Sequence, residues 1–152
     1  MKTNLKLLLI AGIALTSLSG CATDHKTAAA APAVHHSLEG GPWKVVSFDD
    51  GSTVPANVTA EITFEPGDHG TSKVFGNGGC NRFSGGWSQK GSTIKIGPLA
   101  STMMACEPDS SAFESKFHAV LNAASKLSWD ADGTAKISTA DGKWVKLRRA
   151  AS

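Results

Sequence analysis

Hydrophobic and polar residues alternate along much of the chain after residue 42. The pattern is clearest at residues 58–64, VTAEITF, where apolar side chains occupy every even position and Thr or Glu every odd one. A period of two indicates a β-strand with one buried side and one solvent-facing side. Shorter runs bounded by turn-forming residues predict further strands. These runs lie at residues 43–48, 73–76, 82–88, 93–96, 126–130, 135–139 and 143–148.

One segment has the helical period instead. Pro108 and Asp109 lead into it, and Ser111 and Glu114 have the spacing of a capping box at a helix start. Apolar side chains then recur on one helical stripe. They are Phe113, Phe117, Val120, Leu121 and Ala124. We therefore predict an α+β fold in which a strongly curved antiparallel sheet of about eight strands, a partly open barrel, packs around a single α-helix.

Residues 1–20 have the layout of a secretory signal. Lys2 and Lys6 precede an apolar run at residues 7–15, which is too short for a spanning helix. Leu-Ser-Gly-Cys at residues 18–21 is similar to a bacterial lipoprotein box, after whose cleavage Cys21 would carry the lipid. Ala22 rather than Asp follows Cys21; by resemblance to Gram-negative lipoprotein sorting, this implies the outer membrane rather than retention in the inner one. We expect a lipid-anchored protein that faces the periplasm; an ordinary cleaved signal with a free cysteine is the alternative.

The chain after the signal divides into a tether and a domain. Residues 21–37 are Ala-rich and nearly free of large apolar side chains, which predicts a flexible tether. Residues 38–149 then form one folded domain, expected to be monomeric. His35 and His36 in the tether lack a third ligand at a fixed spacing, so no metal site or cofactor is predicted.

The charge of the chain argues against a nucleic-acid partner. The whole chain has a formal net charge of +2, and residues 1–20 contribute two lysines and no acid, so the mature chain is formally neutral. Lys146, Arg148 and Arg149 form a small basic cluster near the end. We interpret this cluster as a solvated strand face rather than a binding patch.

Residues 76–106 concentrate the residues that bear chemistry. Cys80 and Cys106 remain once Cys21 is set aside, an even number in an oxidising compartment. A bond between them would close a loop of about 25 residues and stabilise the fold by about 3 kcal/mol. Two reduced structural thiols, or a nucleophilic Cys80, are the alternatives. The nucleophile would need a nearby histidine, which the local sequence does not supply.

Asn81 and Arg82 are the candidate binding residues. Asn81 follows Gly78 and Gly79 and suits a tight turn. Arg82 would bind an anionic ligand beside the Gly-rich backbone amides; a purely structural turn and arginine are the alternative. The glycine run lacks the Gly-Lys-Ser/Thr end of a phosphate-binding loop.

The block GNGGCNRFSG at residues 76–85, followed by Thr102, Met103-Met104 and Cys106 and then by the predicted helix, resembles the META domain of HslJ-like heat-shock lipoproteins. The resemblance spans residues 38–149. It implies a sheet wrapped round a helix. It also implies a non-enzymatic envelope module connected with heat shock, stress response and antibiotic tolerance, with no established ligand.

The sequence and the resemblance together favour a lipid-anchored binding or stress-protection module with an envelope protein as partner. No grouping of acid, base and nucleophile is recognisable, so we expect no catalytic residues and no enzyme activity. Two alternatives stay open. The domain would inhibit an envelope-acting hydrolase by inserting a loop, or it would hold an acyl chain as a pilot-type lipoprotein of secretion systems does.

Overall fold

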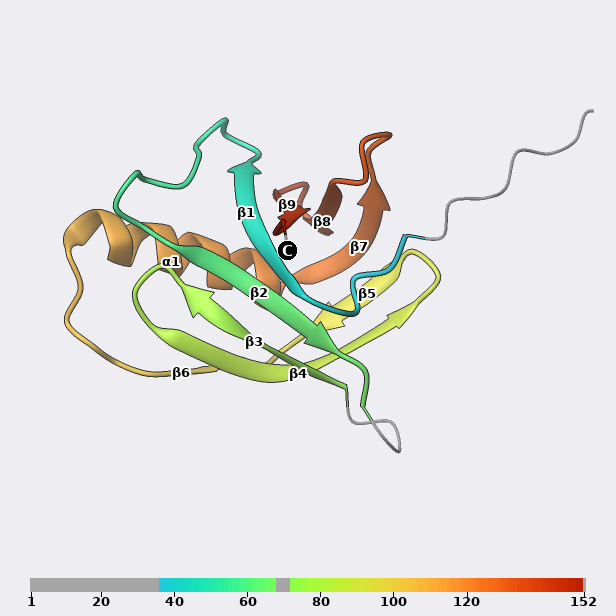
Figure 1. Cartoon of the computed structure of the whole chain (residues 1–152), viewed down its shortest axis with the longest axis horizontal. Helices are drawn as coiled ribbons and strands as arrows, with labels where there is room; N and C mark the ends of the chain where they lie inside the picture. The colour runs from blue at the N-terminus through green and yellow to red at the C-terminus, as the bar shows by residue number, and fades with distance from the viewer. Residues whose placement is uncertain (1–35, 68–71, 152) are drawn as a thin grey trace, which may run out of the picture. The chain divides into compact units, whose positions relative to one another are not determined.

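The computed structural model describes residues 36–67 and 72–151 (Figure 1). The predicted signal, the lipidation residue Cys21 and most of the tether lie outside these ranges. The described chain contains one helix, α1 (Pro108–Asn122), and nine strands. The strands are β1 (Pro42–Phe48), β2 (Ala60–Glu65), β3 (Lys73–Gly78), β4 (Arg82–Lys90), β5 (Thr93–Ile96), β6 (Ala100–Ser101), β7 (Ala124–Trp129), β8 (Ala135–Thr139) and β9 (Trp144–Arg149).

Eight of these strands form a closed antiparallel barrel. Their order is β3-β2-β1-β9-β8-β7-β5-β4, and pairing of β3 with β4 completes the ring. The shortest strand pairing in the ring is between β5 and β7, where Thr93 and Lys126 are the single cross-strand pair. The predicted curved sheet of about eight strands is confirmed, and the ring closes through β3 and β4. The short strand β6 extends the sheet beside β4.

The alternation seen in the sequence fills the barrel with side chains. Apolar residues at every second strand position point inward, and the apolar stripe of α1 packs against side chains from strands on opposite sides of the ring. Phe113 lies edge-on to Phe48, with ring centroids 5.5 Å apart, and Phe117 lies edge-on to Phe83 at 5.9 Å. The largest fully buried side chains are Leu38, Phe48, Ile62, Phe64, Val74, Ile94, Phe117, Val120, Leu121, Ile137, Val145 and Leu147.

The helix boundaries differ from those predicted. The N-cap residue is Glu107, without a side-chain cap, and Pro108 occupies the first turn, where its missing N–H costs nothing. The Ser111 amide donates to the carbonyl of Glu107, so Ser111 is inside the helix and the predicted capping box is wrong. The helix ends at Asn122, so Ala124 belongs to β7.

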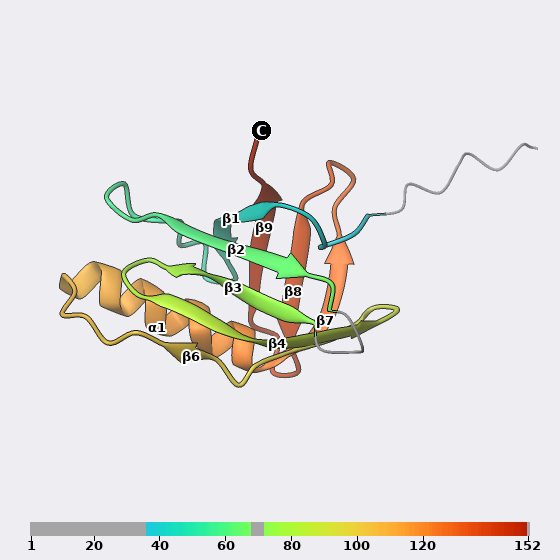
Figure 2. The ribbon, with the colours of Figure 1, turned by 60° about the horizontal axis from the view of Figure 1, so that its bottom comes forward.

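Two further features position the functional region. Because β8 and β9 lie half-way round the ring from β3 and β4, these pairs form opposite walls of the barrel (Figure 2). Strand β6 and the segment that leads to α1 lie on the β4 side. Over residues 36–67 and 72–151, no helix combines the length and the apolar character that crossing a bilayer requires.

Candidate functional site

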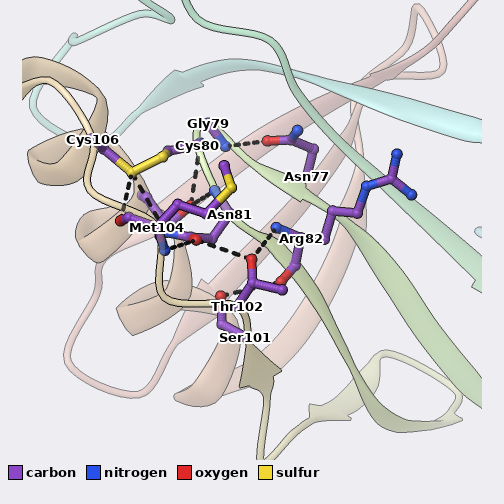
Figure 3. Close-up of a disulfide and its surroundings, with 10 residues drawn as sticks. Asn77, Gly79, Cys80, Asn81, Arg82, Ser101, Thr102, Met104 and Cys106 are labelled. Atoms are coloured by element: carbon purple, nitrogen blue, oxygen red, sulfur yellow. Dashed lines mark hydrogen bonds between the residues drawn. A yellow bond between two sulfur atoms is a disulfide. The ribbon is translucent and has the colours of Figure 1, made fainter.

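A disulfide joins the turn between β3 and β4 to the segment that precedes α1. Cys80 and Cys106 form this bond, with Cα atoms 6.1 Å apart (Figure 3). Of the three states that the sequence leaves open for these cysteines, the structure has the disulfide. The bond ties the segment after β6 to the barrel wall, so that residues 102–106 run between two fixed points.

The side chain of Asn81 holds this segment in place by hydrogen bonds. Its side chain is 6% exposed, and its Oδ1 accepts hydrogen bonds from the Met104 amide at 2.7 Å and the Thr102 hydroxyl at 2.9 Å. Its Nδ2 donates to Glu114 Oε1 at 2.8 Å and contacts Cys106 Sγ at 3.5 Å. Every polar atom of the Asn81 side chain is therefore engaged within the chain. The residue positions the loop and has no group left for a ligand.

Glu114 completes the network from the helix. Its carboxylate accepts hydrogen bonds from the backbone amides of Cys80 and Asn81 as well as from Asn81 Nδ2. Burial raises the pKa of the Glu114 carboxyl, but the hydrogen bonds from Asn81 and Cys80 together outweigh burial and lower it. Glu114 is thus an ionised acceptor that holds the turn. Sequence reasoning assigned it to a helix cap, and no local pattern links it to Asn81, 33 residues away.

The glycines before Cys80 make room for the helix. A Cβ atom on Gly78 would lie 2.7 Å from His118 Nε2 and 2.9 Å from Glu114 Oε2. The His118 ring lies edge-on to Phe83, with centroids 5.0 Å apart, and its Nε2 is buried without a hydrogen-bond partner. Burial lowers the pKa of His118, although the nearby Glu114 carboxylate acts in the opposite direction. The neutral imidazole therefore packs as part of the wall.

Arg82 does not share a site with Asn81. The Asn81 side chain is buried beneath the loop, whereas the Arg82 side chain is exposed and extends away from it (Figure 3). The Arg82 backbone helps to fix the loop, because its carbonyl accepts the Thr102 amide at 3.0 Å and its amide donates to the Thr102 hydroxyl at 3.2 Å. The structure therefore separates the two predicted binding residues.

The segment held by this network presents two methionines to solvent. Met103 is 97% exposed and Met104 is 61% exposed, the largest exposures among the described large hydrophobic residues. We call residues 102–106 the Met loop. Its backbone is fixed by Asn81 and the disulfide, so its apolar side chains project from a constrained support. The sequence shows the Met-Met pair but does not reveal its direction.

Two remaining observations concern metals and the tether. In the two described ranges, no three His, Cys, Asp or Glu side chains gather as a metal-binding group. His36, at the end of the predicted tether, stacks on Trp129, with ring centroids 5.0 Å apart. His35 lies outside the described residues.

Comparison with known proteins places the chain by sequence and by fold. A model of the META domain matches residues 36–152. An NMR structure of a protein from Burkholderia xenovorans has a TM-score of 0.61 and 21% identity, covering 76% of this chain and 85% of that one. A second NMR structure has a TM-score of 0.55 and 20% identity, covering 72% and 89%. No curated protein matches.

Proposed function

Because the chain belongs to the META domain family, we propose that it is a lipid-anchored, non-enzymatic binding module of the bacterial envelope that acts in stress response or antibiotic tolerance. Cys21 is the lipid attachment site, and the domain faces the periplasm from the outer membrane. The partner is an envelope protein with an apolar crevice.

The Met loop is the observation that carries this proposal. Adjacent exposed apolar side chains suit a protein-binding surface, and flexible methionine side chains adapt to irregular crevices. The backbone beneath them is held by a buried asparagine and a disulfide. Such support reduces the ordering entropy lost on binding, because the loop is already in one conformation.

The polar groups around the disulfide support binding rather than catalysis. Asn81 and Glu114 are engaged with each other and with the loop backbone. His118 packs edge-on against Phe83 with its Nε2 buried and without a hydrogen-bond partner, and burial lowers its pKa. The polar groups near Cys80 thus serve the shape of the Met loop.

One alternative, inhibition of an envelope-acting hydrolase, is favoured by the same loop. A fixed, projecting loop with apolar side chains suits insertion into the cleft of another enzyme. Inhibition of lysozyme-type enzymes or proteases at micromolar concentration, lost on Met103→Ser, would support this alternative. The acyl-carrier alternative fits less well, because large side chains occupy the interior of the described barrel.

The anchoring part of the proposal is tested by cell fractionation. We expect the wild-type protein to stay in the outer-membrane fraction after a high-salt wash and the Cys21→Ser protein to be released by that wash, with the domain folded in both. Equal retention of the two proteins after the wash would contradict lipidation at Cys21.

The binding part is tested with the purified lipidated protein and detergent-solubilised envelope proteins. We expect a specific partner to be retained by the wild type and lost from the Met103→Ser/Met104→Ser protein. Phe75→Ser is the matched control, because Phe75 is an exposed hydrophobic residue on β3, 38% exposed. Retention of the same partner by the loop variant, or its loss from both variants, would overturn the assignment of the Met loop.

A further inference from the structure

The outer surface of four neighbouring strands is cationic. Strands β1, β9, β8 and β7 lie side by side (Figure 1) and contain no Asp or Glu. Their inward positions are buried apolar side chains, and five outward positions carry a positive charge. We call these five residues the basic face: Lys44, Lys126, Lys136, Lys146 and Arg148.

Within the basic face, like charges lie directly opposite each other on adjacent strands. Lys44 is the cross-strand partner of Arg148, and Lys136 is the partner of Lys146. Directly opposed like charges destabilise a sheet. The mature chain is formally neutral, so acidic residues are available that could stand opposite these cations. Placing cation opposite cation instead concentrates positive charge on this face and lowers the stability of the sheet. An anionic surface placed against the sheet would relieve that cost.

Acidic residues border the basic face but neutralise only part of it. Asp130 pairs with Lys146 at 2.7 Å, and Asp132 contacts Arg148 at 3.5 Å from a side chain that is 59% exposed. Glu61 is the cross-strand partner of Lys44 on β2. Among the described residues, none of the three ion pairs includes Lys44, Lys126 or Lys136.

A tryptophan lies within the basic face. Trp144 occupies an outward position on β9, and its ring is 5.1 Å from Lys136 Nζ and 5.6 Å from Lys146 Nζ. An indole flanked by lysines is the combination that membrane interfaces favour, because the ring lies at headgroup level while the ammonium groups meet the phosphates.

We propose that the basic face docks on an anionic phospholipid leaflet. The charge of the face is complementary to phosphate headgroups, and the tether leaves the domain beside it. Arg149, the residue after Arg148, donates to the carbonyls of Ser37 and Glu39 at 2.9 and 3.1 Å. The chain between Cys21 and residue 36 spans at most about 50 Å when fully extended. A lipid at Cys21 would therefore hold this side of the domain within about 50 Å of the leaflet, which allows the basic face to reach it.

Docking in this way orients the Met loop. Strands β8 and β9 lie across the barrel from β3 and β4, and the Met loop follows β6 on the β4 side. A domain that rests on its basic face presents the Met loop away from the bilayer. The lipid contact goes beyond the proposed function, since it involves neither the Met loop nor the choice of protein partner.

Vesicle binding tests the contact without the lipid anchor. The mature chain, residues 21–152 with Cys21→Ser, is sedimented with vesicles of phosphatidylethanolamine and phosphatidylglycerol and with vesicles of phosphatidylcholine. We expect binding only to the anionic vesicles, and we expect it to weaken as salt shortens the screening length to about 8 Å at physiological ionic strength. Lys44→Gln/Lys136→Gln should weaken binding roughly 30-fold, since each lysine near an anionic leaflet contributes about fivefold.

The matched control removes two positive charges from the opposite wall. Lys73→Gln on β3 combined with Arg82→Gln on β4 has the same net charge as the basic-face variant and should bind as the wild type does. Equal weakening by both double variants would overturn the proposal, because it would show attraction by net charge alone. Absence of binding to the anionic vesicles would also overturn it. Neither outcome bears on whether the Met loop binds a protein.

Discussion

Replacing Asn81 with alanine should destabilise the domain and release the Met loop. The change removes hydrogen bonds from the Met104 amide and the Thr102 hydroxyl and the bond that Nδ2 donates to Glu114. Neutral hydrogen bonds contribute about 1 kcal/mol each and a bond to a carboxylate about 1.5 to 3 kcal/mol. We therefore expect the free energy of unfolding to fall by about 4 kcal/mol, in part because buried groups lose their partners.

The assay is denaturant unfolding with the disulfide intact, extrapolated linearly to water. Asn77→Ala is the control, because Asn77 is part-buried near the same turn but its Oδ1 accepts one bond, from the Gly79 amide at 2.8 Å. It should lose about 1 kcal/mol. Hydrogen exchange of the Met104 amide should accelerate in Asn81→Ala and not in Asn77→Ala. If Asn81→Ala costs no more than Asn77→Ala, Asn81 is not what holds the Met loop.

Three other perturbations probe the same region. Replacing Cys80 and Cys106 together with serine should lower the free energy of unfolding by about 3 kcal/mol. Reductant should then leave the denaturant concentration at the unfolding midpoint unchanged, since no bond remains to reduce. Gly78→Ala should cost about 1 to 3 kcal/mol by overpacking against His118, whereas Gly86→Ala, whose Cβ would meet nothing nearer than 3.9 Å, should cost far less in the same unfolding assay. Burial lowers the pKa of His118 in the folded chain below its ordinary value of 6.5, so the unfolded chain binds the proton first as the pH falls. His118 should therefore contribute stability above pH 6.5 that is lost as the pH drops below it. The loss should be smaller in His118→Gln, as measured by unfolding across that pH range.

The sheet was predictable because its pattern is local. Residues 58–64 alternate with a period of two, and β2 has the buried and exposed sides that the alternation implies. The apolar stripe of Phe113, Phe117, Val120 and Leu121 likewise predicted the buried face of α1. In both cases the backbone period alone decides which side chains share a face, so tertiary contacts were not needed.

The Met-loop network was less predictable because it joins distant positions. Glu114 lies in a helix and Asn81 in a turn, and the capping-box spacing of Ser111 and Glu114 pointed to a different partner. The pairing of Asn81 with Arg82 as one binding site could have been questioned from sequence, since consecutive residues at the start of a strand face opposite ways.

The basic face required the strand register. The sequence shows Lys146 and Arg148 as part of a cluster that we interpreted as a solvated strand face. Lys44 and Lys136 come from β1 and β8, and only the pairing of these strands with β9 brings them opposite Arg148 and Lys146. A charge patch built across strands is therefore invisible in a linear reading of the chain.

The most direct test of the Met loop as the binding element is site-specific photo-crosslinking of the lipidated protein in living cells. A photoreactive residue is placed at Met103 and, as the control, at Asp141 in the exposed turn between β8 and β9. We expect one envelope protein to crosslink from position 103 and not from position 141, and the crosslink to vanish when Asn81→Ala releases the loop. Equal crosslinking from both positions, or crosslinking that persists without Asn81, would contradict a fixed Met loop as the binding element.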